Sequence, residues 1–356
     1  MFAPRAFLII VAVALSVAAL AQGTEPNRRR DGAEQLPIKL EGSLQNAAWS
    51  PDSKRIVFKH FRSGYNRSPA DLVIFDLQTQ ALTTLIGDGK TNVSQPGSTW
   101  NAPTGRIVFS STRPDHDQIF SMASQGRADT LRQLTESDTH MAYEPSFAPD
   151  GQSIVFESHV VDQEGNGQLR LLKLGAAEAE DLTDHDEDCR QPNWSPAGDL
   201  IVYQKKDDGQ WDLWLYEIRS KQHRRLTQGV GDKTDAATFS SDGRWVLYSA
   251  DNPDLKHAAL FAISVDGKRT VEVTNADVTN ADVYDGAASW SPDGKTIVFE
   301  SAAERPLPPG IRGWILGLWE RLKKLATRSE PSTQLWKIAT PDPLVRQLCL
   351  GGTPCR

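Results

Sequence analysis

The stretch WSPDGKTIVFES, from Trp290 to Ser301, joins a tight turn to an apolar strand. Within it, Pro292 presets the backbone φ angle, the Asp293 side chain can hydrogen-bond to nearby backbone, and Gly294 tolerates a left-handed conformation. The residues after the turn are β-branched and aromatic, with few polar positions. This composition favours a strand that is buried on both faces.

The same phrase occurs six times along the chain. Its copies are WSPDSKRIVF from Trp49, WNAPTGRIVF from Trp100, FAPDGQSIVF from Phe147, WSPAGDLIVY from Trp194, FSSDGRWVLY from Phe239 and WSPDGKTIVF from Trp290. The aromatic anchors are 51, 47, 47, 45 and 51 residues apart. A period in the forties, with several short strands in each unit, is typical of a β-propeller.

Each copy continues with a second apolar strand and then with a strand that ends near a Leu-Thr pair, such as Leu226-Thr227. With the short strand that enters each anchor, every unit holds four strands. The chain is therefore predicted to be an all-β, six-bladed β-propeller with four-stranded blades. The blades are expected at about 44–87, 94–135, 141–183, 189–227, 235–274 and 285–349. We expect each anchor aromatic to wedge between adjacent blades, burying roughly 150–250 Å².

These copies resemble the TolB-like propeller repeat, a WD40-like family built from units of the form PSWSPDG…IVF…LT. The resemblance covers about residues 44–349. It departs from TolB itself in one respect, because no N-terminal α/β domain is expected between the signal peptide and the first blade. The family also includes propeller domains of peptidases and a polysaccharide lyase, so the fold alone does not select a function.

The N-terminus reads as an export signal. Residues 1–21 combine Arg5, an apolar run from Ala6 to Leu20, and a small-residue cleavage pattern before Gln22, which is typical of a signal peptide. An uncleaved membrane anchor is the alternative. Residues 22–34 are expected to be a flexible lead-in, and residues 35–356 form the predicted propeller domain. The protein is therefore expected to be periplasmic or extracellular, with envelope association as a further alternative.

The sequence does not decide how the cysteines pair or which segment closes the ring. An exported protein could oxidise its three cysteines, so a Cys349–Cys355 disulfide and three free thiols, Cys189 included, are both compatible with the sequence. The ring could be closed by an outer strand from residues 35–42, or that place could be filled by residues 344–349.

A helical insert interrupts the last blade at residues 302–333. Its apolar residues recur at three- and four-residue steps and include Trp314, Trp319 and Leu322, and residues 311–328 carry a charge of +4. This pattern predicts an amphipathic helix. It could pack on the propeller, dock a protein partner, or lie as a peripheral helix in the headgroup region of a membrane.

The loops that join consecutive blades are acidic. Residues 136–146, 184–193 and 275–289 each carry −3, residues 228–238 carry −1 and residues 87–99 are neutral, so their sum exceeds the whole chain's −7. An acidic rim could attract a cationic peptide, a metal ion or the basic helix itself. The candidate ligand- or partner-binding residues on this face and on the helix are Asp138, His140, Glu144, Asp184, His185, Asp186, Asp188, Asp235, Asp282, Asp285, Trp314, Trp319 and Leu322.

No cofactor is predicted, and a divalent metal in the channel is the alternative. His140 and His185 lie in consecutive loops among carboxylates, a ligand set that suits several divalent metals. Resemblance to the polysaccharide lyases of this superfamily implies a His-based metal centre in the channel. No residue spacing in this chain fixes such a site, and solvated acidic loops explain the same residues.

The first functional hypothesis is an exported, monomeric, non-enzymatic scaffold. It binds a protein or cell-envelope component through the acidic face and the helical insert. The second is a metal-assisted, carbohydrate-active enzyme that uses the channel. No catalytic residue is predicted, because the sequence has no nucleophile elbow, no metalloprotease motif and no P-loop. The negative charge argues against nucleic acid as a partner.

Overall fold

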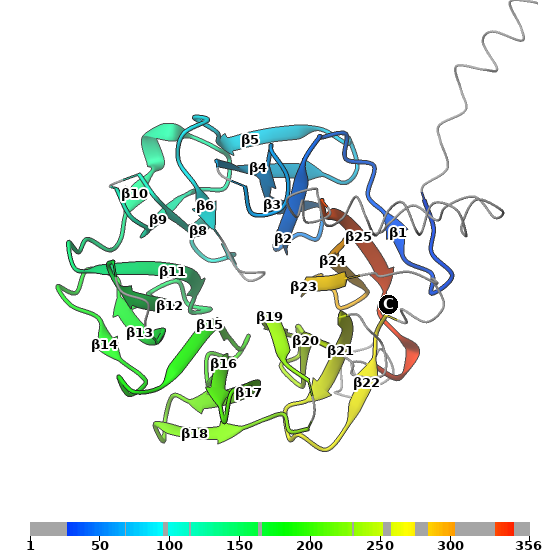
Figure 1. Ribbon diagram of the computed structural model, residues 1–356. Coiled ribbons are helices and arrows are strands. Elements are labelled where there is room, and N and C mark those ends of the chain that lie inside the picture. Colours follow the sequence, from blue (N-terminus) through cyan, green and yellow to red (C-terminus); the bar gives the residue numbers. More distant parts are fainter. Residues whose placement is uncertain are drawn as a thin grey trace, which may run out of the picture.

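The computed structural model describes residues 27–67, 69–94, 99–113, 115–162, 166–229, 231–251, 258–274, 284–302 and 332–344. Six antiparallel sheets are arranged as a ring around a central axis (Figure 1). Each sheet runs outward from an inner strand. The prediction of an all-β, six-bladed propeller with four-stranded blades is confirmed.

The first three blades follow one another along the chain. Blade 1 consists of β2 (Ser43–Trp49), β3 (Arg55–Phe61), β4 (Ala70–Asp76) and β5 (Leu82–Ile86). Blade 2 has an inner strand split into β6 (Val93–Ser94) and β7 (Trp100–Asn101), followed by β8 (Arg106–Ser111), β9 (Gln118–Ala123), the 3-10 helix η1 (Ala128–Thr130) and β10 (Arg132–Gln133). Blade 3 consists of β11 (His140–Phe147), β12 (Ser153–Val160), β13 (Gln168–Lys173) and β14 (Glu180–Asp181).

The last three blades complete the ring. Blade 4 consists of β15 (Asp188–Trp194), β16 (Leu200–Asp207), β17 (Gln210–Glu217) and β18 (Gln222–Arg225). Blade 5 consists of β19 (Lys233–Phe239), β20 (Trp245–Asp251), β21 (Ala258–Ser264) and β22 (Thr270–Glu272). Blade 6 contains β23 (Tyr284–Trp290), β24 (Thr296–Ala302) and β25 (Gln334–Ala339), and its outer strand is β1 (Glu34–Gln35) from the N-terminal side.

The anchor aromatics pack between blades, as predicted. Each anchor belongs to a hydrophobic cluster that also contains core residues of the preceding blade. Trp49, for example, packs with Val298 and Leu335 of blade 6, and its indole Nε1 donates a hydrogen bond to the Ser289 carbonyl at 3.1 Å. The repeated phrase therefore supplies the aromatic side chain that packs each blade against the preceding one.

The opening turn is held by its serine and aspartate. Ser291 Oγ donates to Asp293 Oδ1 at 2.6 Å and accepts the Thr296 backbone N–H at 3.0 Å, while Gly294 adopts a φ of +70°. These bonds satisfy polar groups of the turn locally. The turn therefore delivers the chain directly into the buried strand.

The fourth copy achieves the same turn with a different residue. Ala197 stands where four of the other five copies have aspartate, and Ser195 Oγ donates instead to Asp199 Oδ1 at 2.7 Å. Ser195 Oγ still accepts the Leu200 backbone N–H at 3.0 Å. Asp199, two positions after Ala197, therefore supplies the carboxylate that Asp293 supplies in the turn described above.

The Leu-Thr pairs close each blade on its outer side. In blades 2 to 5 the threonine Oγ1 accepts a backbone N–H from the third strand at 2.8–3.0 Å, and the preceding Leu or Val donates its own N–H to the same residue's carbonyl. The third-strand residues that donate one of these bonds through the N–H and accept the other through the carbonyl are Ile119, Leu169, Leu213 and Leu260. Each pair therefore makes two hydrogen bonds to one residue of the third strand, and these bonds hold the end of the outer strand in place.

Inner strands are bulged at the same position in several blades. Asn46, Glu144, Gln191 and Ala287 adopt positive φ angles of 45–51°, next to a shift in the pairing register of their strands. Two of these bulges are tied to the preceding blade. Glu300 Oε2 accepts the Asn46 backbone N–H and Glu157 Oε2 accepts the Gln191 backbone N–H, each at 3.0 Å.

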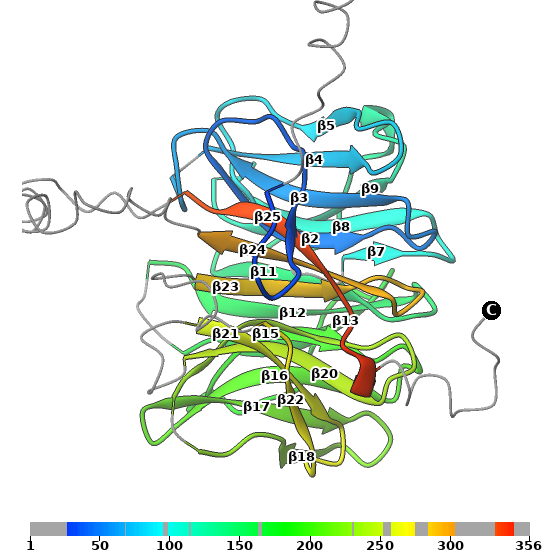
Figure 2. The same cartoon turned by 90° about the vertical axis from the view of Figure 1, so that its right-hand side faces the viewer.

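The two ends of the chain close the ring in blade 6. β1 pairs antiparallel with β25, with Glu34 opposite Lys337, and so fills the outer place that the sequence left open. The Leu44 backbone N–H of blade 1 donates to the Thr333 carbonyl at 3.0 Å, and β2 and β25 lie side by side (Figure 2). Closure therefore uses β1 for blade 6 and direct contacts between blades 6 and 1.

Residues 27–34 fall in the segment predicted as a flexible lead-in, and they pack on blade 6. Arg29 donates to both carboxylate oxygens of Asp285, at 2.7 and 2.8 Å, and to Asp31 at 2.6 Å. The Arg29 side chain is 6% exposed and that of Asp285 is 0% exposed. This buried ion pair fastens the N-terminal segment, which we call the strap (residues 27–35), to β23.

Several predictions lie outside the described residues. They are the signal peptide, the helical insert apart from its ends, the loop from 275 to 283, and Cys349 and Cys355. Cys189 is described as a free, buried thiol between blades 3 and 4, and burial raises its pKa to about 12. Within the described ranges, no helix is long and apolar enough to cross a membrane.

Candidate functional site

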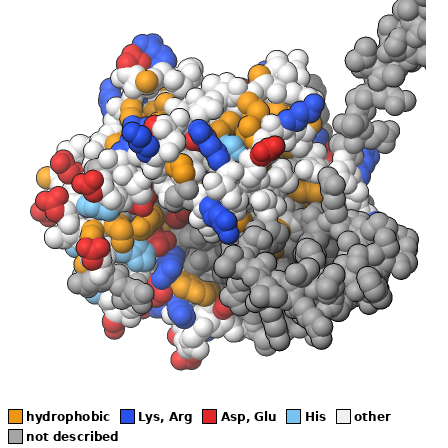
Figure 3. Space-filling model, turned by 45° about the horizontal axis from the view of Figure 1, so that its top comes forward, with side chains coloured by type: hydrophobic (Ala, Val, Ile, Leu, Met, Phe, Trp, Pro, Cys, Tyr) orange, Lys and Arg blue, Asp and Glu red, His pale blue; other side chains and the backbone are white. Residues whose placement is uncertain are grey.

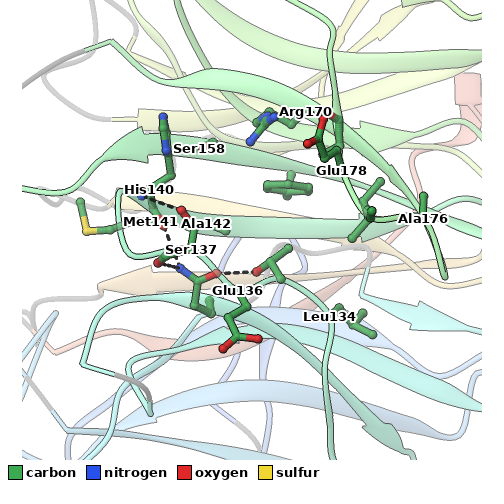
Figure 4. Close-up of a pocket in the computed structure, with 16 residues that line it drawn as sticks. Leu134, Glu136, Ser137, His140, Met141, Ala142, Ser158, Arg170, Ala176 and Glu178 are labelled. Carbon is green, nitrogen blue, oxygen red and sulfur yellow. Dashed lines mark hydrogen bonds between the residues drawn. The ribbon is translucent and has the colours of Figure 1, made fainter.

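Two adjoining hollows lie on the side of blade 3 that faces blade 2. The larger, of about 410 Å³, opens beside the inter-blade loops, and the smaller, of about 210 Å³, runs between the two blades. His140, Ser158 and Arg170 line both hollows, and Figure 4 shows them with Leu134 and Glu136 of blade 2 across the smaller one. We call the two hollows together the blade 2–3 cleft.

Strand order explains how these residues meet. His140 begins β11, Ser158 is near the end of β12 and Arg170 is near the start of β13, so antiparallel pairing places all three near the inter-blade-loop edge. His140 is half-buried and Ser158 is 2% exposed. The cleft thus combines the ends of three strands with the loop that leaves the outer strand.

Polar contacts in the cleft centre on Asp181. Arg170 Nε donates to Asp181 Oδ1 at 2.6 Å, and Arg170 Nη2 donates to the Ala179 carbonyl at 3.1 Å. His185 Nε2 lies 3.9 Å from Asp181 Oδ2, beyond hydrogen-bond distance. His140 Nδ1 is 2.9 Å from the Thr139 hydroxyl. The structure therefore brings both predicted histidines to one cleft.

Acidic side chains surround the cleft. Residues 134–142 carry a formal charge of −2 and residues 166–188 carry −5, which together equal the net charge of the whole chain, −7. On the left of Figure 3, the side where blade 3 lies in Figure 1, acidic and histidine side chains gather around an apolar patch. This part of the surface attracts cations.

The other predicted residues of these loops differ in their exposure to solvent. Asp138, Asp184 and Asp186 are exposed. Asp188 is half-buried, accepts the Gly167 backbone N–H at 2.9 Å and is paired with Arg190. Its carboxylate is therefore engaged in holding the loop between β12 and β13.

Among the residues predicted in blade 5, blade 6 and the insert, Asp285 is the one whose side chain the structure describes. Asp235 belongs to β19, and its side chain lies outside what is described, as do Asp282, Trp314, Trp319 and Leu322. Asp285 is occupied by Arg29 on both oxygens and is fully buried. Asp285 is therefore placed to hold the strap.

A second polar cluster, which sequence reasoning missed, lies where blades 1, 2 and 3 meet. Lys59 Nζ donates to Ser94 Oγ at 3.2 Å, and Ser94 Oγ donates to Glu144 Oε1 at 2.7 Å. Asp117 is next to it, and burial raises its pKa to about 6, with the Glu144 charge adding to the shift. Of this cluster, only Glu144 was predicted, because the others lie in strands or follow no loop pattern.

Tyr143 connects Asp117 to the inner strand of blade 3. Burial raises the pKa of Tyr143 to about 12, and the nearby Asp117 charge contributes to the same shift. The Tyr143 ring lies edge-on to His159 with centroids 5.8 Å apart, and His159 is hydrogen-bonded to Glu157 at 2.5 Å. The cluster therefore groups polar and titratable side chains from three blades, joined partly by hydrogen bonds and partly by charge and ring contacts.

Within the described ranges, no group of three or more His, Cys, Asp or Glu side chains is arranged to hold a metal ion. His140 and His185 line the same cleft, with Asp181 as the nearest carboxylate. This set offers hydrogen-bond acceptors and donors for a polar ligand.

Sequence comparison finds relatives with the same repeat. The chain is 27% identical over 163 residues to the Tol-Pal system protein TolB of Francisella tularensis, which is 46% of this chain and 35% of that protein. It is also 27% identical over 160 residues to an uncharacterised peptidase, YuxL, of Bacillus subtilis, covering 44% of this chain and 21% of that one. The match thus spans about a third of the length of the curated TolB relatives.

Solved structures share the fold at low sequence identity. TolB from Acinetobacter baumannii superposes with a TM-score of 0.53 at 18% identity, covering 73% of this chain and 58% of that chain. An oligogalacturonate lyase in complex with manganese has a TM-score of 0.54 at 11% identity, covering 90% of this chain and 97% of the other. These likenesses show the fold.

A family model supplies the assignment. The model described as the TolB beta propeller domain matches residues 30–282, more than half of the chain. That range includes five of the six anchor phrases and the blades that form the cleft. The chain belongs to the TolB β-propeller domain family.

Proposed function

We propose that this protein is an exported propeller that acts as a non-enzymatic binding protein. Its partner is a protein or envelope component, engaged through the inter-blade-loop face around the blade 2–3 cleft. The observation that carries the proposal is a group of exposed acidic residues in the loops beside an open cleft on that face, Glu136, Asp138, Asp184 and Asp186. Complementary charge speeds the encounter of partners and suppresses wrong ones.

Family membership is consistent with this proposal. The curated TolB relatives are named as parts of the Tol-Pal system, and we infer a comparable role in an envelope assembly for this chain. The basic, Trp-bearing insert at 302–333 would supply a second contact with the partner. Export to the periplasm or the exterior follows from the N-terminal sequence and belongs to the same proposal.

Affinity capture from the native envelope tests the proposal. The intact protein is compared with Glu136→Gln/Asp184→Asn/Asp186→Asn, with Trp314→Ala/Trp319→Ala, and with the matched control Asp129→Asn/Glu217→Gln on the opposite, turn-bearing face. We expect the first two variants to lose the same captured protein and the control to retain it. Equal capture by all four forms would reject the inter-blade-loop face as the binding surface.

The metal-assisted enzyme is the second hypothesis, and it rests on a likeness of fold at 11% identity. Metal content of the purified protein and turnover of an acidic polysaccharide test it directly. Stoichiometric metal that is lost in His140→Ala/His185→Ala, together with turnover, would favour the enzyme over the binding protein.

A further inference from the structure

We propose that the blade 2–3 cleft binds a lysine or arginine side chain, carried by an extended segment of a protein partner. This inference rests on the proposed function and specifies which chemical group the partner presents to the cleft. It starts from hydrogen-bond acceptors that line the cleft and keep acceptor capacity among the described residues.

Ser158 supplies the first of these acceptors. Ser158 as a whole is 2% exposed and lines both hollows, and its hydroxyl has no hydrogen-bond partner among the described residues. Its oxygen is not among the buried polar atoms left without a partner, so it is open to solvent in the hollow and can accept a hydrogen bond from a ligand that displaces water. The ligand must therefore reach into the cleft with a donor.

His140 and Asp181 supply the other acceptors. When His140 Nδ1 donates to Thr139 Oγ1, its Nε2 is left as an acceptor in the larger hollow. Arg170 donates to Oδ1 of Asp181, and Oδ2 lies 3.9 Å from Nε2 of His185, beyond hydrogen-bond distance. A hydroxyl, an imidazole nitrogen and a carboxylate oxygen thus line one space, which suits a donor with several N–H groups.

Charge selects a cationic donor over a neutral or anionic one. Arg170 is the cation within the cleft, and its charge is balanced by Asp181. In the walls, formed by residues 134–142 and 166–188, three carboxylates are paired with cations from outside these segments, namely Glu180 with Lys221, Glu187 with Lys205 and Asp188 with Arg190. The three pairs reduce the −5 of residues 166–188 to −2, and residues 134–142 add a further −2, so a carboxylate ligand would be repelled. An ammonium or guanidinium group is attracted by the same field.

The shape of the cleft fits a long aliphatic side chain. The smaller hollow is lined by Leu134, Phe156 and Leu172 below the polar rim, which gives methylene groups an apolar surface. Lys and Arg bury their alkyl stems in this way while the charged end meets polar atoms. The volumes of about 410 and 210 Å³ leave room for a side chain and the adjoining backbone.

Fluorescence anisotropy with a labelled peptide tests the inference. The probe is acetyl-Gly-Lys-Gly-Lys-Gly-amide, the reference is the same peptide with glutamate in place of lysine, and the protein is the full mature chain. We expect binding of the lysine peptide only. Raising the salt concentration should weaken it, because the attraction is electrostatic.

Three variants locate the binding. Asp181→Asn and Ser158→Ala should each weaken the peptide about five- to tenfold, since each removes one hydrogen bond to a charged group. Glu136→Gln, an exposed wall residue, should weaken it by about twofold, because exposed charges contribute little. Asp129→Asn is the matched control, an arginine-paired aspartate on the opposite face, and should bind as the unchanged protein does.

The outcomes separate this inference from the proposed function. Equal binding of the lysine and glutamate peptides, or binding unaffected by Asp181→Asn and Ser158→Ala in folded protein, would overturn the inference. Spermidine competing as well as the peptide at equal concentration would also overturn it, since the site would then take a free amine. If these cleft variants still capture the envelope partner, the cleft inference fails while the proposed function stands.

Discussion

Asp117 shows how a single buried carboxyl can make the propeller sensitive to pH. Its neighbours are Tyr143 and Glu144 of blade 3, Lys59 of blade 1 and His116. Burial raises its pKa from the ordinary 3.8 to about 6, so the folded state holds this proton more tightly than the unfolded chain does. Stability from this group is therefore greatest at low pH and is lost as the pH rises through the interval between 3.8 and about 6.

Replacing Asp117 with asparagine should remove that loss. We expect Asp117→Asn to be more stable than the unchanged protein at pH 7.5 by about 1–2 kcal/mol, a full shift of two pKa units being reduced by partial solvent exposure. Near pH 4 the difference should vanish. Urea unfolding followed by tryptophan fluorescence at both pH values measures it, with the exposed Asp115→Asn as control. A variant that is less stable at pH 7.5, or a pH-independent difference, would contradict the assignment.

Among single residues, the sequence predicted those whose contacts lie a few positions away along the chain. The Ser-Pro-Asp-Gly turns were predictable because each turn uses residues a few positions apart. The substitution of Asp199 for the absent aspartate was not, since only the fold shows that both positions reach Ser195. Asp117 was missed because its neighbours come from three blades.

The strap is the element on which closure of the ring depends. β1 has two residues and one neighbouring strand, so its pairing alone contributes little. Arg29 adds a buried ion pair with Asp285 and lies over the rings of Phe299 and Trp336, at 5.6 and 5.7 Å from their centroids. The strap is therefore held more by one side chain than by its strand.

Loss of Arg29 should weaken the whole ring. Arg29→Ala leaves Asp285 charged and buried, and we expect a loss of about 3 kcal/mol in the free energy of unfolding. Arg28→Ala is the matched control, because the Arg28–Glu34 pair is exposed and should contribute less than about 1 kcal/mol. Urea unfolding of both variants measures the two losses. Equal losses would show that the buried pair does not hold the strap.

Strands that belong to the repeat were predicted, including the short outer strands β10 and β14, whereas β1 lies outside the repeat. The inner and middle strands carry the repeated apolar phrases, so their order followed from the sequence. β1 has no such pattern, and the sequence left residues 35–42 and 344–349 as competing choices. The bulges at Asn46 and Gln191 had no sequence signature, because neither residue is a glycine.

The whole molecule shows why the fold was easier to predict than the site. Six copies at a regular period specify the ring, since each anchor repeats the same contact with the preceding blade. The blade 2–3 cleft arises from residues that the repeat does not conserve, on strands of two blades. Acidity of the loops was visible in the sequence, but the convergence of His140, Ser158 and Asp181 depended on pairing register.

Hydrogen–deuterium exchange of the protein, alone and bound to its captured partner, tests the central claim most directly. If the inter-blade-loop face binds the partner, exchange should slow in residues 134–142, 166–172 and 181–188. The turns at residues 50–54 and 291–295 on the opposite face should exchange at the same rate in both states. Protection confined to those turns, with the inter-blade loops unchanged, would contradict the account.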